Sequence, residues 1–148
     1  MERSFAGRTM SLLRAREQAR SILDVDYERL YGLGKRAVLF DLDNTLGGRR
    51  PAELSPAVKE LLDHLTQMGF RVGILTNRRI GTKDPVIVDL AAKYPLRYRA
   101  GKPRKSGFLE ILAQMDVPPS KAVMIGDRLL TDVLGANRLG IYSIHIKA

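Results

Sequence analysis

The segment that decides the fold reads Ala37-Val38-Leu39-Phe40-Asp41-Leu42-Asp43-Asn44-Thr45. Its first part, residues 37–40, is a short apolar run, which is typical of a buried strand. Asp41 and Asp43 follow at once and lie two residues apart, so at the end of a strand their side chains can point the same way. The segment therefore predicts a strand that delivers two carboxylates to one edge of a sheet.

Short apolar runs alternate with helical patterns along the rest of the chain. After residues 37–40, further strands are predicted at 71–75, 96–100, 122–125 and 141–146. Helices are predicted between them at 55–69, 84–94, 108–115 and 130–140. The first two of these helices begin with a capping residue followed by proline, at Ser55-Pro56 and Asp84-Pro85. This alternation is typical of an α/β fold, in which helices cover both faces of a parallel sheet in three layers.

Composition limits the chemistry that this chain can perform. A length of 148 residues suits one compact domain, and we expect residues 1–148 to form one, with residues 1–34 as a helical extension packed on it. The absence of cysteine excludes disulfides, a thiolate nucleophile and a cysteine-ligated zinc site. His64 and His145 are too few for a polyhistidine metal site. Any catalysis must therefore rest mainly on carboxylates, hydroxyls, lysine and arginine.

The formal net charge of +9 favours anionic partners, namely phosphate esters, nucleic acid or an acidic membrane surface, although excess positive charge can also serve solubility alone. Basic and apolar residues alternate from Leu12 to Leu23. This pattern indicates an amphipathic helix, which packs on its own domain or lies on an anionic membrane. No apolar run is long enough to span a bilayer or to form a signal peptide. We expect a cytoplasmic protein, with peripheral attachment to a membrane left open.

In parallel α/β folds, ligands bind beyond the carboxyl ends of the strands. Those positions here hold Asp41 and Asp43, Thr76 and Asn77, Lys102, Asp127 and, five residues later, Asp132. Close carboxylates repel one another unless a cation lies between them, and hard oxygen ligands suit Mg²⁺. One carboxylate can attack phosphorus, another can move protons, and Thr76 can hold phosphoryl oxygens. The set predicts a magnesium site for phosphoryl transfer.

Four segments, in chain order, resemble the four motifs of the haloacid dehalogenase (HAD) superfamily. They are Asp41-Leu-Asp-Asn-Thr-Leu46, Leu75-Thr76-Asn77, Gly101-Lys102-Pro103 and Gly126-Asp127-Arg-Leu-Leu-Thr-Asp132. The resemblance implies a Rossmann-like HAD fold whose strands, numbered along the chain, lie in the order 5-4-1-2-3. It also implies a phosphatase of the phosphoric monoester hydrolase class that works through a phospho-aspartyl intermediate.

The resemblance assigns a role to each residue of the set. Asp41 is implied to be the nucleophile, and Asp43 the general acid and base. Thr76, with Asn77 beside it, and Lys102 are implied to bind the phosphate, with Lys102 also neutralising charge. Asp41, Asp127 and the backbone carbonyl of Asp43 are implied to hold Mg²⁺. Asp132 is implied to act through water or by orienting Lys102.

A narrower similarity concerns the substrate. Residues 21–30 and 127–137 resemble the YqeG-like branch, which is similar to the phosphatidylglycerophosphate phosphatases of mitochondria and plastids. This implies a lipid phosphate substrate. Residues 45–54 and 76–102 leave no room for the cap domain that superfamily members often carry, so the chain resembles the capless class III. An uncapped site is open to bulky substrates, or is closed by a neighbouring subunit in an oligomer.

We therefore expect a Mg²⁺-dependent phosphatase for phosphate esters, with phosphatidylglycerophosphate at an anionic membrane surface as the specific candidate. Two alternatives remain open. The charge also suggests a nucleic-acid-binding protein or a polynucleotide phosphatase, although the chain lacks an aromatic-rich basic platform on which bases could stack. The open site also suits a small-metabolite phosphatase that is capped by a neighbouring subunit.

Overall fold

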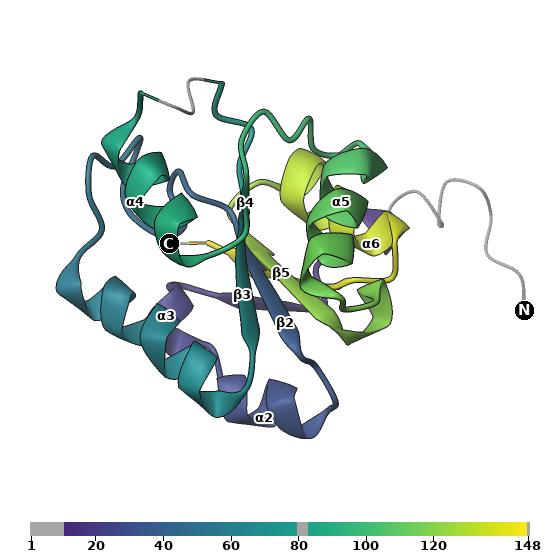
Figure 1. Ribbon diagram of the computed structural model, residues 1–148. Helices are drawn as coiled ribbons and strands as arrows, with labels where there is room; N and C mark the ends of the chain where they lie inside the picture. The colour runs from purple at the N-terminus through teal and green to yellow at the C-terminus, as the bar shows by residue number, and fades with distance from the viewer. Residues whose placement is uncertain (1–10, 80–82, 148) are drawn as a thin grey trace, which may run out of the picture.

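The computed structural model describes residues 11–79 and 83–147, and these residues form one six-stranded parallel sheet (Figure 1). The strands are β1 Glu17–Ala19, β2 Ala37–Phe40, β3 Arg71–Leu75, β4 Leu96–Arg97, β5 Ala122–Gly126 and β6 Tyr142–Ile146. Their order across the sheet is β1-β6-β5-β2-β3-β4, and every neighbouring pair is parallel. The strand from the deciding segment, β2, therefore lies inside the sheet between β5 and β3.

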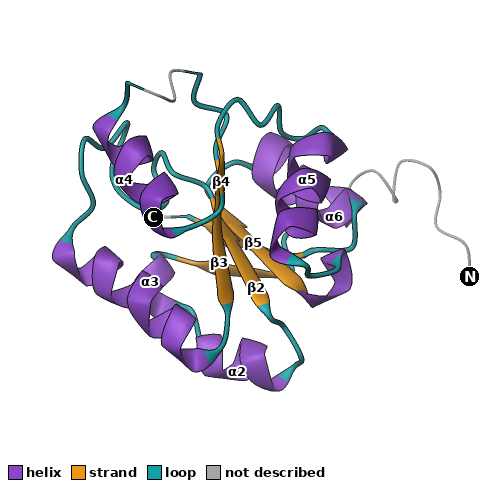
Figure 2. Cartoon of the chain, viewed as in Figure 1, coloured by secondary structure: helices purple, strands orange, loops and turns teal. Residues whose placement is uncertain are grey.

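Helices cover both faces of this sheet, as the sequence predicts. They are α2 Tyr27–Gly32, α3 Pro56–Met68, α4 Pro85–Lys93, α5 Lys105–Met115 and α6 Leu134–Arg138, with a π-helix at Leu129–Val133 and short 3₁₀ helices at Ile22–Asp24 and Pro119–Lys121. Helices α3 and α4 lie on one side of the sheet, and α5 and α6 lie on the other (Figures 1 and 2). The predicted three-layer α/β/α architecture is confirmed.

The alternation of side chains along β2 explains its apolar sequence. Val38 and Phe40 belong to the core cluster on the α3 and α4 side, whereas Ala37 and Leu39 belong to the cluster on the α5 side. All four residues are fully buried. Because successive side chains of a strand point to opposite faces, a strand covered on both faces must be apolar throughout. The next residue, Asp41, leaves the core at the carboxyl edge of the sheet.

Local signals set the predicted helix starts and stops. The Ser55 hydroxyl accepts a hydrogen bond from the backbone N–H of Val58 at 3.3 Å, and Pro56 occupies the first turn. The same helix ends at Gly69, whose φ of +108° is a left-handed conformation that glycine adopts without strain. The Asp84 carboxylate caps α4 by accepting from the backbone N–H of Val86 at 3.3 Å.

The five predicted strands occur in the predicted order 5-4-1-2-3, and the predicted count was one too low. The predicted strand 96–100 is also shorter than expected, because the sheet pairing ends at Arg97. Beyond it, the backbone N–H groups of Arg99 and Ala100 donate to the carbonyls of Arg78 and Thr76 at 2.8 and 3.0 Å. These two hydrogen bonds hold the loop that follows β3, and this loop carries part of the candidate site.

The predicted amphipathic helix near the N-terminus is wrong over residues 13–21, which are not helical. Residues 17–19 form β1, which pairs with β6 through Glu17 opposite Ile144 and Ala19 opposite Ile146. The side-chain amide of Asn137 also donates to the carbonyls of Leu12 and Arg14 at 2.7 and 2.9 Å. The open edge of β6 satisfies the backbone of this segment, and this pairing outweighs the helical preference of its alanine, arginine, glutamate and glutamine residues.

Residues 1–10 lie outside the described part of the chain. The expected division into a single domain 1–148 with an extension 1–34 stays a prediction. Among the helices that the structure describes, none has both the length and the apolar character needed to cross a membrane.

Candidate active site

The residues singled out by the sequence gather at the carboxyl edge of the sheet. Asp41 directly follows β2, Thr76 follows β3 and Asp127 follows β5. The backbone N–H of Asp41 donates to the carbonyl of Ile125 at 2.9 Å, which extends the β2–β5 pairing by one residue and fixes the start of the loop. The loop after β4 brings in Lys102. Four separate segments thus meet at one place.

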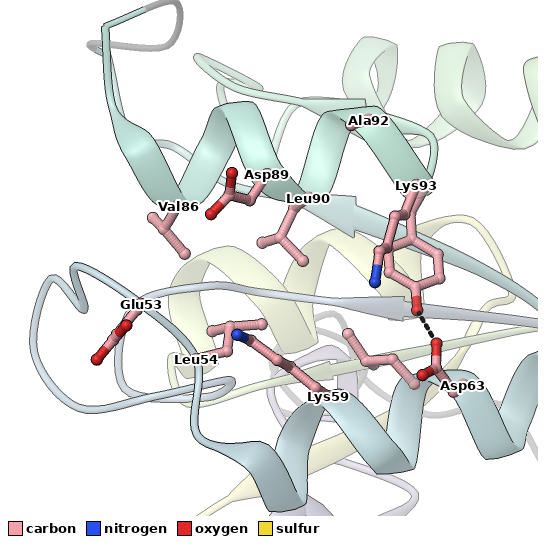
Figure 3. Close-up of a pocket in the computed structure, with 11 residues that line it drawn as sticks. Glu53, Leu54, Lys59, Asp63, Val86, Asp89, Leu90, Ala92 and Lys93 are labelled. Carbon is pink, nitrogen blue, oxygen red and sulfur yellow. Dashed lines mark hydrogen bonds between the residues drawn. The ribbon is translucent and has the colours of Figure 1, made fainter.

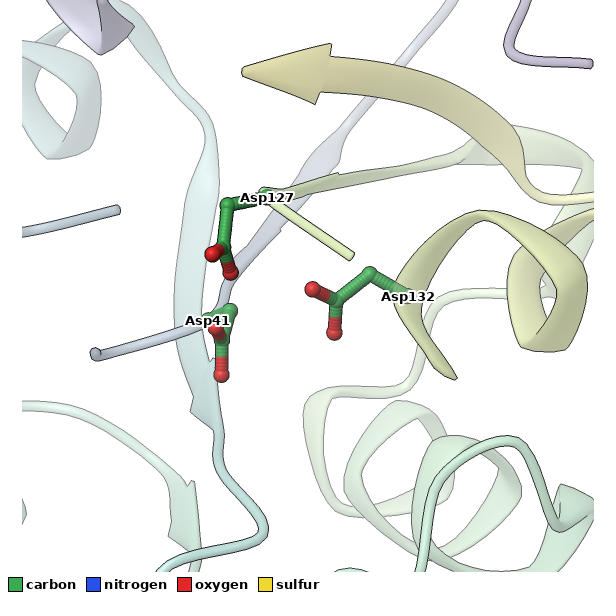
Figure 4. A group of neighbouring side chains, drawn as sticks. All are labelled: Asp41, Asp127 and Asp132. Carbon is green, nitrogen blue, oxygen red and sulfur yellow. The ribbon is translucent and has the colours of Figure 1, made fainter. Parts of the chain in front are cut away.

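Three carboxylates face one another at this edge. Asp41, Asp127 and Asp132 each offer one carboxylate oxygen, and these oxygens lie within 4.8 Å of one another (Figure 4). Asp132 comes from the π-helix and approaches β5 at Gly126, where a Cβ would lie only 2.2 Å from the Asp132 Oδ2. Only glycine therefore allows this approach. Asp132 is not among the metal ligands expected from the sequence. The structure places its carboxylate in one group with those of Asp41 and Asp127.

The protonation of this group reflects its burial. Burial, and next the neighbouring charge of Asp41, raise the pKa of Asp127 above its usual value. Burial raises the pKa of Asp132 to about 6, with Asp41 adding to the rise and Lys102 opposing it. Asp127 Oδ1 is buried and has no hydrogen-bond partner among the described residues. A buried, unpaired carboxylate oxygen beside two further carboxylates is suited to a hard divalent cation such as Mg²⁺.

These raised pKa values predict a pH dependence for the effect of added Mg²⁺ on thermal stability. A carboxyl whose pKa is raised on folding contributes stability that is present below its unfolded pKa and is lost as pH rises, here through about 6 for Asp132. We therefore expect Mg²⁺ to raise the thermal midpoint more at about pH 7 than at about pH 5, where protons already neutralise the group. Thermal denaturation with Mg²⁺ and with EDTA at both pH values measures this. Equal shifts at the two pH values in the wild type, or an undiminished difference in Asp132→Asn, would contradict it.

Lys102 is fully enclosed and hydrogen-bonded at every available position. Its Nζ donates to Asp41 Oδ1 at 2.9 Å, to Asp132 Oδ1 at 2.6 Å and to the carbonyl of Leu75 at 2.7 Å. Burial lowers the pKa of Lys102, but the two carboxylates outweigh it and the pKa is raised overall. The Lys102 ammonium therefore joins Asp41 to Asp132, and the expectation that Asp132 orients Lys102 stays a prediction.

Asn77 holds the main chain of Lys102. The Lys102 N–H donates to Asn77 Oδ1 at 2.9 Å, and Asn77 Nδ2 donates to the Lys102 carbonyl at 3.1 Å. The side chain that the sequence associated with substrate is thus occupied in positioning Lys102, and direct contact of Asn77 with a phosphate stays a prediction. Thr76 is buried at the floor of the site, and its Oγ1 accepts from the backbone N–H of Arg78 at 3.1 Å.

Sequence reasoning missed Arg78. Its side chain is only 3% exposed, and its guanidinium forms ion pairs with Asp43 on one side and Asp84 on the other. The Asp43 carboxylate, 30% exposed, therefore lies with Arg78 and outside the three-carboxylate group. Binding of metal by the Asp43 backbone carbonyl stays a prediction. Two signals could have pointed to Arg78: it follows the Thr76-Asn77 motif directly, and Asp84 caps the next helix.

His145, to which the sequence assigned no role, also contacts the site. Its Nε2 lies 2.9 Å from the backbone carbonyl oxygen of Asp127, which steadies the strand end that carries that carboxylate. His64, by contrast, is an exposed residue of α3.

The site opens into a cavity of about 490 Å³. It is lined by Asp41, Asp43, Arg50, Thr76, Asn77, Arg78, Arg79, Lys102, Arg128 and Thr131. Within the described residues, no domain is inserted after β2, where a loop leads to α3, or after β3, where only α4 and β4 precede Lys102. The cavity is therefore lined by polar and charged residues, is rich in arginine and has no cap over it in this part of the chain.

A second cavity of about 390 Å³ lies between α3 and α4 (Figure 3). Its floor is apolar and consists of Leu54, Leu62, Val86 and Leu90, and charged side chains surround it. Tyr94 donates to Asp63 at 3.2 Å across its far end. The lining includes none of the predicted site residues, so the chemistry belongs to the first cavity.

Comparisons with known proteins agree with this geometry. Residues 9–140 match the family model described as haloacid dehalogenase-like hydrolase. The Bacillus subtilis protein named Probable phosphatase YqeG is 31% identical over 132 residues, which cover 86% of this chain and 73% of that protein. The protein named phosphatidylglycerophosphate phosphatase 1, chloroplastic, of Chlamydomonas reinhardtii is 27% identical over 151 residues, which cover 97% of this chain and 56% of that protein.

The fold itself recurs among solved structures. A protein of Corynebacterium glutamicum superposes with a TM-score of 0.66 at 21% identity, over 78% of this chain and 87% of that chain. At this identity, the likeness concerns the fold alone.

Proposed function

Because this chain belongs to the haloacid dehalogenase-like hydrolase family, we propose that it is a phosphomonoester phosphatase that uses Mg²⁺ and forms a phospho-aspartyl intermediate on Asp41. The observation that carries the proposal is the group formed by Asp41, Asp127 and Asp132 with the buried ammonium of Lys102. Phosphoryl transfer needs mainly positioning and charge neutralisation, and this group supplies both.

Each residue has a part in the proposed reaction. Lys102 holds the Asp41 carboxylate, so that an Asp41 oxygen can attack phosphorus while the bond from phosphorus to the leaving oxygen breaks. Asp43 gives a proton to the leaving oxygen and later takes one from the water that hydrolyses the acyl phosphate. Thr76 and nearby backbone amides bind the phosphoryl oxygens. Mg²⁺, when bound by Asp41 and Asp127 with Asp132 beside them, offsets the negative charge of the phosphoryl group.

The specific substrate that we propose is phosphatidylglycerophosphate. The similarity to the algal phosphatase supports it, since that similarity covers nearly the whole of this chain. The uncovered cavity supports it as well, because a phosphate carried on a large body must reach Asp41 without passing a cap. The chain spans about half the length of the algal protein, so substrate identity rests on the chemistry of this cavity.

A substrate panel tests the proposal. We expect Mg²⁺-dependent release of phosphate from a soluble aryl phosphate, and a higher kcat/KM for phosphatidylglycerophosphate in mixed micelles than for sugar phosphates. A clear preference for sugar phosphates would favour the small-metabolite alternative, with a neighbouring subunit as cap. A preference for phosphorylated oligonucleotide ends would favour a polynucleotide phosphatase. No hydrolysis of any phosphomonoester would contradict the proposed function.

The ion pairs of Arg78 predict a loss of turnover when they are broken. Arg78→Met removes the ion-pair partner of Asp43, so the carboxylate of this proposed general acid and base is no longer held at the cavity. We expect kcat to fall by about tenfold or more, with a smaller change in KM. Arg78→Lys keeps the charge but cannot bridge two carboxylates, so it should restore kcat only in part. Steady-state kinetics on an aryl phosphate measure both.

Arg97→Met is the matched control, because the ion pair that Arg97 forms among the described residues is an exposed one, with Glu110 at 3.8 Å. Such pairs contribute little, and we expect its kcat to match the wild type. Wild-type kcat in Arg78→Met would show that the guanidinium does not position Asp43.

A further inference from the structure

Three exposed arginines lie at the mouth of the site cavity, and only Arg128 among them is near enough to a site carboxylate, that of Asp127, to affect its pKa within the described residues. Arg50, Arg79 and Arg128 line the cavity and are exposed. Within residues 11–79 and 83–147, none of the three forms an ion pair with a carboxylate, whereas the neighbouring Arg78 forms two. Two further exposed arginines, Arg99 and Arg104, lie in the loop after β4 at the same edge. The mouth therefore presents guanidinium groups outward.

Two large apolar side chains lie beside these arginines. Leu129 and Leu130 follow Arg128 directly and are 40% and 66% exposed. The residues on either side of the pair, Arg128 and Thr131, both line the cavity, so the leucines lie within one helical turn of its mouth. The same π-helix buries its Val133 in the protein. The fold thus uses this helix to pack Val133 and Asp132 inward while it leaves two leucines in water.

An exposed aromatic side chain lies at the same edge of the sheet. Tyr98 follows β4 directly and is exposed, next to Arg99. Arginine, leucine and tyrosine side chains together have the chemistry of a surface that lies on lipid headgroups: the guanidinium groups bind phosphates, and the apolar groups enter the boundary with the acyl chains. Nucleic acid would use the arginines but would gain nothing from two exposed leucines.

We propose that this mouth, formed by Arg50, Arg79, Arg128, Leu129 and Leu130, docks on an anionic lipid bilayer. Docking there turns the cavity towards the membrane, so that a phosphomonoester at the headgroup level meets Asp41 without leaving the bilayer. The expected docking surface thus moves from the N-terminal segment, part of which is a strand of the sheet, to the active-site edge. The inference rests on the proposed function, because docking matters only if the site acts on a lipid phosphate. It concerns membrane binding, which is measured without any catalytic turnover.

The experiment measures sedimentation of the full chain with vesicles of phosphatidylcholine, with and without phosphatidylglycerol, in the absence of Mg²⁺. We expect binding only to the anionic vesicles and weaker binding as salt rises. The double variant Leu129→Ser, Leu130→Ser should bind the anionic vesicles at least about tenfold more weakly. It loses two leucine side chains that docking would bury in part in the bilayer. Arg128→Gln should weaken binding by about fivefold.

Leu33→Ser is the matched control. Leu33 is 58% exposed, but it lies at the end of α2, at the opposite edge of the sheet, so its replacement should leave vesicle binding unchanged. The leucine double variant should hydrolyse a soluble aryl phosphate as the wild type does, because neither leucine lines the cavity.

Three outcomes would overturn the docking surface. They are wild-type affinity of the leucine double variant for anionic vesicles, an equal loss of affinity in Leu33→Ser, and no binding of the wild type to anionic vesicles. In the last case, RNA binding that the leucine variant retains would assign the arginines to nucleic acid. In each case, Mg²⁺-dependent hydrolysis of the aryl phosphate would still support the phosphatase, so the two proposals fail separately.

Discussion

Replacement of Asp41 by asparagine is expected to lower kcat on an aryl phosphate by at least about 1,000-fold. Asparagine has nearly the same size as aspartate, and its amide oxygen can still accept the hydrogen bond that Lys102 gives to Asp41. It cannot, however, form an acyl phosphate. The loss therefore measures the nucleophile and leaves the geometry around Lys102 in place.

The variant should also fold normally. In the absence of metal, removing one of three facing carboxylates lowers their mutual repulsion, so the thermal midpoint of Asp41→Asn should equal or exceed that of the wild type. Asp116→Asn is the matched control: Asp116 ends α5 far from the carboxyl edge, in a left-handed conformation that asparagine tolerates. We expect wild-type kcat for it. A kcat for Asp41→Asn within about tenfold of the wild type would exclude Asp41 as nucleophile.

Removal of divalent cations is expected to have the second largest effect. With EDTA, kcat on the same substrate should fall by about 100-fold or more, and added Mg²⁺ should restore it. The reason is that Asp41, Asp127 and Asp132 face the incoming phosphate dianion, while one ammonium, that of Lys102, contacts them. The arginines of the cavity can attract the substrate to its mouth. Without a further cation among the three carboxylates, however, the phosphoryl group is repelled at the point where Asp41 must attack.

Asp127→Asn sharpens this experiment. Asp127 Oδ1 has no hydrogen-bond partner among the described residues, so its carboxylate is available to the cation and its loss should chiefly affect metal binding. We expect the Mg²⁺ concentration for half-maximal rate to rise by about tenfold or more. An Asp127→Asn variant with an unchanged Mg²⁺ requirement would place the metal elsewhere, and full turnover in EDTA would rule out a metal role altogether.

The parts of the fold that depend on short-range patterns could be predicted from the sequence. The apolar run 37–40 predicts a strand covered on both faces, and Ser55-Pro56 and Asp84-Pro85 predict helix starts; the structure contains all three. Because carboxyl ends of parallel strands share one edge, the approach of Asp41, Thr76 and Asp127 also follows from the element order alone.

Other features depend on contacts between distant segments, which local patterns do not encode. Residues 17–19 form a strand because the edge of β6 is open to them, although their own sequence resembles a helix. Asp132 joins the carboxylate group because residues 129–133 adopt a π-helix and Gly126 leaves room, which a spacing of five residues does not reveal. Arg78 lies between two carboxylates that come from separate loops.

A chemical quench of the Asp43→Asn variant during turnover tests the central claim most directly. An aryl leaving group needs little help from an acid, whereas hydrolysis of the intermediate needs the Asp43 base, so the phosphoenzyme should accumulate. With Mg²⁺, we predict a burst of one aryl alcohol per chain and, in the acid-quenched protein, a phosphoryl group on the peptide that contains residue 41. Turnover without any phosphoryl group on that peptide, or its presence on another residue, would contradict the account.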